Sequence, residues 1–97
     1  MPTYVSLLNY THQGIQNIKD SPKRLDAAKK LLKGMGGELK AFYLTMGAYD
    51  IVVVAEAPSD EVMARFALAV GSAGNVRTTT LKAFTEAEYR KIIQGLP

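Results

Sequence analysis

The hydrophobic positions of this 97-residue chain fall into strand-like runs separated by stretches with helical spacing. Four runs rich in β-branched, aromatic and aliphatic residues are bounded by polar or glycine-containing segments, which is typical of strands. Between them, apolar residues recur at steps of three and four, as in helices that bury one face. The predicted strands are residues 3–10, 38–45, 49–57 and 76–84.

Two helices of similar length are predicted between these strands. The first has Ser21 as its N-cap and Pro22 at its first helical position, and it ends in the glycine-containing segment 34–37. The second spans residues 58–74, and the polar segment before the first helix is expected to be a loop. The sequence Thr-Glu-Ala-Glu at 85–88 resembles a capping box, which predicts a short C-terminal helix.

This order of elements predicts the fold class. A β-α-β-β-α-β arrangement with right-handed crossovers gives a four-stranded antiparallel sheet with both main helices on one face. The chain is therefore expected to be an α+β protein of the ferredoxin-like type with a short C-terminal helix. Because no repeat, linker or low-complexity segment divides it, we expect a single domain over residues 1–97.

The second face of such a sheet has no cover within the chain. Residues 51–55 are apolar without interruption, so both sides of the third strand are apolar. Side chains of a strand alternate between the two faces of a sheet. In the second strand, one face is therefore expected to carry Leu39, Ala41 and Tyr43, and the other face Phe42 and Leu44. A second copy of the chain could cover the open face. We therefore expect a homodimer or higher homo-oligomer in a dimeric α/β-barrel association.

Composition excludes several functions. The net charge of +3 comes mainly from residues 19–33, most of whose basic side chains lie on the first predicted helix, which indicates a solvated helix face rather than a nucleic-acid surface. The absence of cysteine excludes disulfides and thiolate metal sites. The N-terminus lacks signal-peptide features and no apolar run reaches the ~20 residues of a membrane helix. The expectation is a cytoplasmic protein without cofactor, nucleic-acid partner or membrane contact.

Candidate chemistry concentrates in the segment 46–50. Gly47 gives the backbone freedom for a turn, Tyr49 brings a hydroxyl, and Asp50 puts a carboxylate at the start of an apolar strand. That carboxylate needs a partner, which could be a backbone amide, Arg24, His12 or a ligand. Two interpretations stay open: Asp50 caps the turn while Tyr49 packs in an interface, or the segment forms a binding pocket.

His12, the sole histidine, follows the first strand. A metal site needs about three clustered ligands, which His12 and Asp50 do not supply, so no metal is expected. The ordinary interpretation is a surface-loop residue. The alternative is a general base, a role that imidazole performs near neutral pH.

Several motifs together resemble the bacterial GYD-domain family, from about residue 4 to residue 93. They are Gly47-x-Tyr49-Asp50, Tyr10-Thr11-x-Gln13-Gly14, Arg24, Pro58 and the segment Val-Arg-Thr-Thr-Thr-Leu-Lys-Ala-Phe-Thr at 76–85. The resemblance implies a fold similar to stand-alone dimeric α/β-barrel proteins and a shared site, without naming a ligand. The turn 44–50 is also similar to the small-molecule-sensing domain of Lrp/AsnC-type regulators. Because the first strand begins at residue 3, no helix-turn-helix is expected ahead of it, and any sensing role is expected to be without direct DNA binding.

Two functions follow as hypotheses. The first is an oligomeric module that binds a small polar or aromatic molecule between helices and sheet or at a subunit interface. The expected site residues are Thr11, Gln13, Gly14, Arg24, Tyr43, Gly47, Tyr49 and Asp50. The alternative is a cofactor-independent monooxygenase or isomerase with His12 or Asp50 as base. A base needs an open cavity beside it, whereas a capping aspartate is held by backbone amides. A purely structural assembly role is compatible with the same features.

Overall fold

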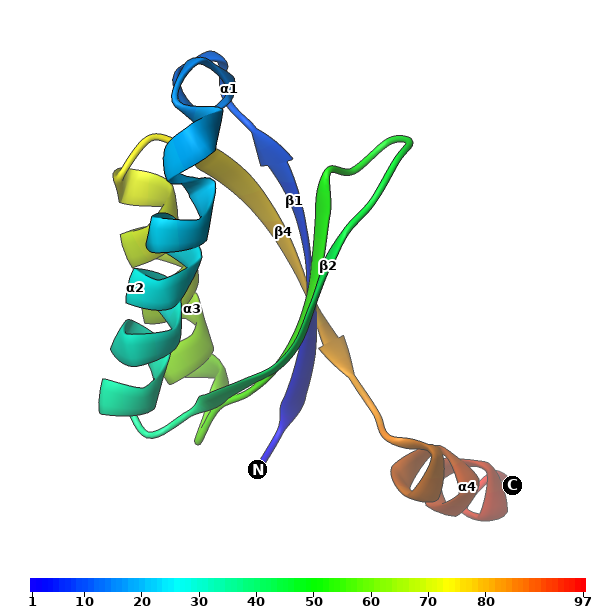
Figure 1. Cartoon of the computed structure of the whole chain (residues 1–97). Coiled ribbons are helices and arrows are strands. Elements are labelled where there is room, and N and C mark those ends of the chain that lie inside the picture. Colours follow the sequence, from blue (N-terminus) through cyan, green and yellow to red (C-terminus); the bar gives the residue numbers. More distant parts are fainter.

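A computed structural model describes residues 1–97 and has the predicted order of strands and main helices (Figure 1). The elements are β1 (Thr3–Tyr10), α1 (His12–Gln16), a 3₁₀ turn (Ile18–Asp20), α2 (Ser21–Gly34), β2 (Glu38–Leu44), β3 (Ile51–Glu56), α3 (Asp60–Ser72), β4 (Val76–Ala83) and α4 (Glu86–Gln94). None of the helices combines the length and the apolar composition that crossing a bilayer requires.

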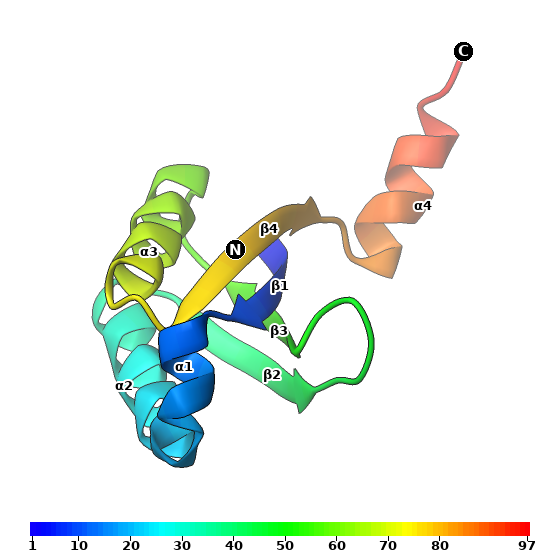
Figure 2. The same ribbon diagram turned by 90° about the horizontal axis from the view of Figure 1, so that it is seen from above.

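The four strands form one antiparallel sheet in the order β2-β3-β1-β4. Helices α2 and α3 lie side by side on one face of it, so the molecule has a helix layer and a sheet layer (Figure 2). This arrangement confirms the predicted ferredoxin-like α+β fold. The two central strands, β1 and β3, carry most of the sheet's contribution to the core.

The predicted loop before α2 is wrong, because this segment contains α1 and a 3₁₀ turn. Thr11 starts α1 as its N-cap, since its side-chain oxygen accepts a hydrogen bond from the Gly14 amide at 3.1 Å. The N-cap of α2 is Asp20 rather than Ser21. A five-residue helix with one large apolar side chain, Ile15, has too few turns to produce a periodic pattern.

The core lies between the helix layer and the sheet. Alternate residues of β1 and β3 point toward the helices and meet one buried leucine of α2 and two large side chains of α3. The buried apolar residues are Tyr4, Leu8, Leu32, Ile51, Val53, Ala55, Ala57, Met63 and Phe66. Burial of such side chains stabilises the fold by about 1.5–3 kcal/mol for each of the large ones.

The opposite face of the sheet has no covering element, as predicted. Leu7 pairs with Val52 and Val5 pairs with Val54, so apolar side chains of the two central strands lie next to each other on this face. All four are half-buried. Leu81 of β4 extends the surface and is 49% exposed. We refer to this surface as the open face.

The predicted alternation of β2 is wrong at Leu39. The pairing of β2 with β3 shifts register between Leu39 and Ala41, so Lys40 is an extra residue in a β-bulge. Leu39 pairs with the buried Ala55 and lies on the helix side with Phe42, where both line the same cavity. Nothing in the local sequence marks the bulge, because a bulge depends on how the neighbouring strand pairs.

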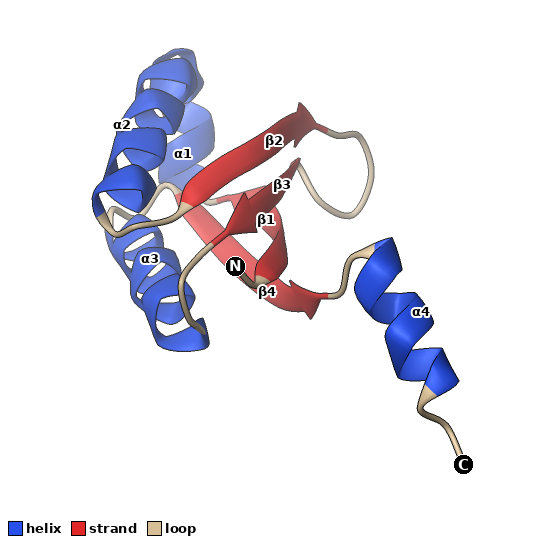
Figure 3. Ribbon diagram, turned by 90° about the horizontal axis from the view of Figure 1, so that it is seen from below, coloured by secondary structure: helices blue, strands red, loops and turns tan.

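Helix α4 lies beyond the end of β4, on the side of the sheet opposite α2 and α3 (Figures 1 and 3). The predicted capping box is confirmed: the Glu88 amide donates to Thr85 Oγ1 at 3.2 Å, and the Thr85 amide donates to Glu88 Oε1 at 2.9 Å. No residue of α4 is buried. Its apolar side chains, including Tyr89, Ile92 and Ile93, are about half exposed.

Candidate functional site

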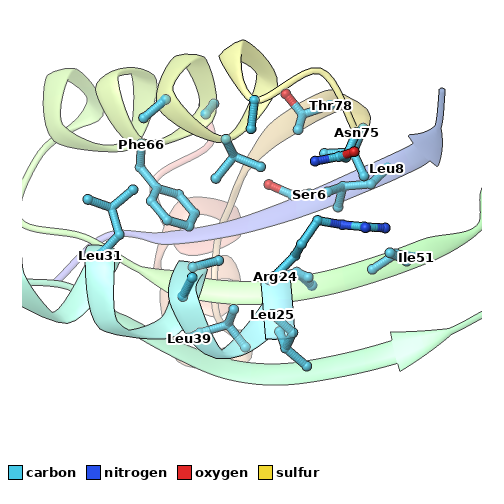
Figure 4. Close-up of a pocket in the computed structure, with 18 of the residues that line it drawn as sticks. Ser6, Leu8, Arg24, Leu25, Leu31, Leu39, Ile51, Phe66, Asn75 and Thr78 are labelled. Atoms are coloured by element: carbon cyan, nitrogen blue, oxygen red, sulfur yellow. The ribbon is translucent and has the colours of Figure 1, made fainter. Parts of the chain in front are cut away.

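A cavity of about 280 Å³ lies between the two main helices and the sheet (Figure 4). Of its 22 lining residues, 17 are hydrophobic, which makes the walls apolar. Short side chains line it, namely Ala27 and Ala28 of α2, Ala67 and Ala69 of α3, and Ala73 directly after α3. Ala28 and Ala67 are half-buried, and their short side chains leave space in an interior that is otherwise close-packed.

Arg24 is the only charged residue that lines this cavity. It comes from the second turn of α2, and its side chain is half-buried. Its Nη1 donates to the Asn17 carbonyl at 2.9 Å and its Nη2 to the Gly14 carbonyl at 3.3 Å. The guanidinium is therefore fixed against the C-terminal end of α1, where carbonyl groups favour a cation.

A few uncharged polar groups also line the cavity. The Ser6 hydroxyl forms a hydrogen bond with the Thr80 hydroxyl, with 2.9 Å between the two oxygens. The Tyr10 hydroxyl forms one with the Ser21 hydroxyl, also at 2.9 Å. The side-chain oxygen of Asn75 accepts from Gln13 Nε2 at 3.1 Å, which leaves the Asn75 amino group without a partner in the chain. Figure 4 shows Asn75 at the same end of the cavity as the Arg24 guanidinium.

The loop between α3 and β4 is contacted by three residues at the start of α1, namely Thr11, Gln13 and Gly14. Thr11 Oγ1 donates to the Gly74 carbonyl at 2.6 Å, and Gln13 Nε2 donates to the Ala73 carbonyl at 3.2 Å. A Cβ at Gly14 would lie 2.0 Å from the Asn75 carbonyl oxygen, so only glycine allows this approach. These three predicted site residues are thus brought together with Arg24, but they hold the loop that carries Asn75 and do not line the cavity.

Gly47, Tyr49 and Asp50 lie in the loop between β2 and β3, outside the cavity lining. Asp50 Oδ2 accepts a hydrogen bond from the Tyr10 amide at 2.9 Å, so its partner is a backbone amide. The Tyr49 carbonyl accepts from Thr45 Oγ1 at 2.6 Å, and Gly47 has a φ of +129°. The segment closes the turn and joins it to the end of β1.

Tyr43 and His12 lie apart from the cavity. Tyr43 pairs with Val52, which places it on the open face with 61% of its surface exposed. His12 is exposed on α1 and makes no side-chain hydrogen bond. The cavity lining includes no histidine, aspartate or glutamate. No three side chains of the types that bind metal ions cluster in the chain.

A separate polar cluster joins β1, α3 and β4. The hydroxyl of the buried Tyr4 donates to the Asp60 carboxylate, which also lies 3.2 Å from Lys82 Nζ. Burial, with the neighbouring carboxylate, raises the pKa of Tyr4 to about 12. The hydrogen bonds from Tyr4 and Lys82 lower the pKa of Asp60. These contacts are those of a structural cluster at the start of α3.

Sequence reasoning missed Ser6 and Asn75 as cavity residues. Ser6 could have been recognised from the sequence, because it is the one polar residue between Tyr4 and Leu8 on the helix-facing side of β1. Asn75 could not, since an asparagine after a glycine is common in turns. Its role depends on contacts with α1, which was not predicted.

Comparison with known proteins finds similarity in sequence and, separately, in fold. The GYD domain model matches residues 4–93. A Thermus thermophilus protein named glutamine synthetase and cystathionine beta-lyase binding protein is 34% identical over 89 residues, which cover 91% of this chain and 94% of the relative.

Two solved structures share the fold at low identity. A feast or famine regulatory protein from M. tuberculosis, complexed with L-methionine, superposes with a TM-score of 0.67 at 14% identity. MtbAldR superposes with a TM-score of 0.68 at 15% identity. Each comparison covers 88% of this chain, which spans about half the length of those proteins, 51% and 52%.

Proposed function

Because this chain belongs to the GYD-domain family, we propose that it is a binding module that takes a small molecule into the cavity between its helices and its sheet. The cavity itself carries the proposal. It has apolar walls, a volume of about 280 Å³ and a few polar groups gathered at one end. Sites for small molecules combine such walls with a small number of orienting polar groups.

The composition of the cavity supports binding over turnover. A cofactor-free monooxygenase or isomerase needs a general base beside its substrate. The two candidates, His12 and Asp50, are absent from the lining. Asp50 instead accepts a hydrogen bond from a backbone amide. The proposed module is therefore non-catalytic.

We propose further that the module acts as a homodimer or higher homo-oligomer in the cytoplasm. The support is the open face, where Val5, Leu7, Val52 and Val54 form an apolar strip that no element covers. Contiguous apolar surfaces of this kind mark protein contacts, and a second copy offers a matching one. Association through this face leaves the cavity on the outer side of each sheet accessible.

A cavity-filling variant tests the small-molecule proposal. Ala28 lines the cavity, so Ala28→Leu places three extra carbon atoms in it. A library of small organic acids, amides and aromatic compounds is screened for compounds that raise the melting temperature of the wild type. Compounds that do so are expected to lose the effect in Ala28→Leu and to keep it in Ala87→Leu, which alters the exposed surface of α4. If the effect persists in Ala28→Leu, the cavity is not the site.

A second candidate function is the binding of metabolic enzymes, and the similarity to the Thermus thermophilus protein favours it. The match covers nearly the whole of both chains, so the positions of any docking surface of that protein have aligned positions here. The exposed apolar side of α4 is the proposed contact, because none of its residues is buried within the chain.

Purified glutamine synthetase from the same host tests this second function. Biolayer interferometry is expected to detect binding by the wild type and by Leu68→Lys, whose side chain is 74% exposed on α3. Ile92→Lys on α4 is expected to abolish that binding. Equal binding by both variants excludes α4 as the contact, and no binding by the wild type excludes this enzyme as the partner.

A further inference from the structure

We infer that the ligand of the cavity is a small monocarboxylic acid with an apolar body, and that Arg24 binds its carboxylate. The inference rests on the proposed function, because it names the chemical class that the same cavity takes. It follows from the charge of the cavity, the hydrogen-bond donors left free in it and the nature of its walls.

Arg24 carries a positive charge that nothing in the chain neutralises. The ion pairs of the molecule are Lys40–Glu38, Arg65–Glu61, Lys82–Asp60 and Arg90–Glu86, and Arg24 belongs to none of them. No acidic residue lines the cavity. The two protein partners of Arg24 are neutral backbone carbonyls, so the guanidinium keeps its full charge at the edge of the apolar lining. An anionic ligand supplies a partner for that charge.

Arg24 also has hydrogen-bond donors that the protein does not use. A guanidinium has five N–H groups, of which the Asn17 and Gly14 carbonyls use two. Those two bonds fix the group in position, which lowers the entropy lost when a ligand binds. The free donors suit the paired oxygens of a carboxylate, and the amino group of Asn75 at the same end adds another donor.

The walls exclude ligands with further charges. A dicarboxylate or a sugar phosphate would place its second polar part against the apolar remainder of the lining. An amino acid would bring an ammonium group, for which the cavity offers no carboxylate. A carboxylic acid with a hydrocarbon or aromatic body fits both parts of the cavity, because its carboxylate can bind Arg24 while its apolar body contacts the apolar walls.

Isothermal titration calorimetry with 3-phenylpropanoate, its amide and phenylalanine tests the inference. The wild type is expected to bind the acid about 10-fold to 100-fold more tightly than the amide, the range for a charge-assisted hydrogen bond. Phenylalanine is expected to bind more weakly than the acid. In Arg24→Gln, affinity for the acid is expected to fall to that for the amide, while affinity for the amide stays unchanged.

The ratio of the two affinities separates ligand binding from a structural role for Arg24. Arg24→Lys keeps the charge and is expected to retain part of the preference for the acid, which provides a second variant if Arg24→Gln does not fold. If the wild type binds acid and amide equally, or if Arg24→Gln weakens both equally, the inference is overturned while the cavity remains a binding site. If neither compound binds and the library gives no cavity-dependent hit, the proposed function fails with it.

Discussion

At the scale of single residues, Asp50 is held by the backbone. Its carboxylate accepts from the Tyr10 amide, and its own amide donates to the Leu8 carbonyl, both at 2.9 Å. Asp50→Ala removes the acceptor and leaves a partly buried amide unpaired, which is expected to lower the free energy of unfolding by about 1–3 kcal/mol. Asp50→Asn keeps a carbonyl oxygen and is expected to cost less, as measured by urea denaturation.

The same two variants separate a structural Asp50 from a ligand-binding one. Neither is expected to change the affinity of the folded protein for 3-phenylpropanoate, because Asp50 does not line the cavity. An Asp50→Asn protein of unchanged stability that no longer binds the acid would assign the carboxylate to the ligand instead.

Tyr4 makes stability depend on pH at the alkaline end. Its pKa is raised to about 12 in the folded protein, against about 10 for an unfolded tyrosine. A raised pKa means that the stabilisation is complete below pH 10 and is lost as the pH rises toward 12. The free energy of unfolding of the wild type is therefore expected to fall across this interval.

Tyr4→Phe is expected to lower stability at pH 8 by about 1 kcal/mol, because it removes the hydrogen bond to Asp60. It should also lessen the alkaline fall, since the residue no longer titrates. Urea denaturation at pH 8 to 12 measures both effects. Parallel pH profiles for the two proteins would show that Tyr4 is not responsible.

At the scale of elements, α1 is positioned by its contact with the loop between α3 and β4. Gly14→Ala would put a methyl group against the Asn75 carbonyl and is expected to destabilise the fold by about 1–3 kcal/mol. Gly71→Ala on α3 meets no atom within 4 Å and is expected to stabilise by roughly 0.5–1 kcal/mol, since alanine favours helices. Similar unfolding free energies for the two variants would contradict this account of the contact.

The elements also explain what sequence reasoning could and could not foresee. Strands and long helices were predicted because their alternation and periodicity are local properties, and the capping box at Thr85 is equally local. Helix α1 and the bulge at Lys40 depend on contacts with distant segments. Arg24 was predicted as a site residue, and the structure places it in the lining of the cavity. The cavity it lines was not predictable in detail, because it arises where alanines of two separate helices face one sheet.

At the scale of the whole molecule, two surfaces have different expected roles. The cavity side is proposed to bind the ligand, and the open face is proposed to join copies of the chain. Val54→Lys puts a charge in the middle of the open face and is expected to produce monomers, as measured by size-exclusion chromatography with light scattering.

Leu68→Lys makes a comparable change on the outer side of α3 and should leave the oligomer intact. An oligomer that survives Val54→Lys would move the interface away from the open face. A wild type that is already monomeric at micromolar concentration would remove the oligomer proposal altogether.

The most direct test of the central claim is to locate the bound ligand by methyl NMR during titration with 3-phenylpropanoate. The account predicts saturable shifts for cavity methyl groups of Leu8, Leu25, Ile51 and Val76, with Leu68 unchanged. Shifts confined to Val5, Leu7 and Val52 on the open face, or no shift at any methyl group, would contradict it.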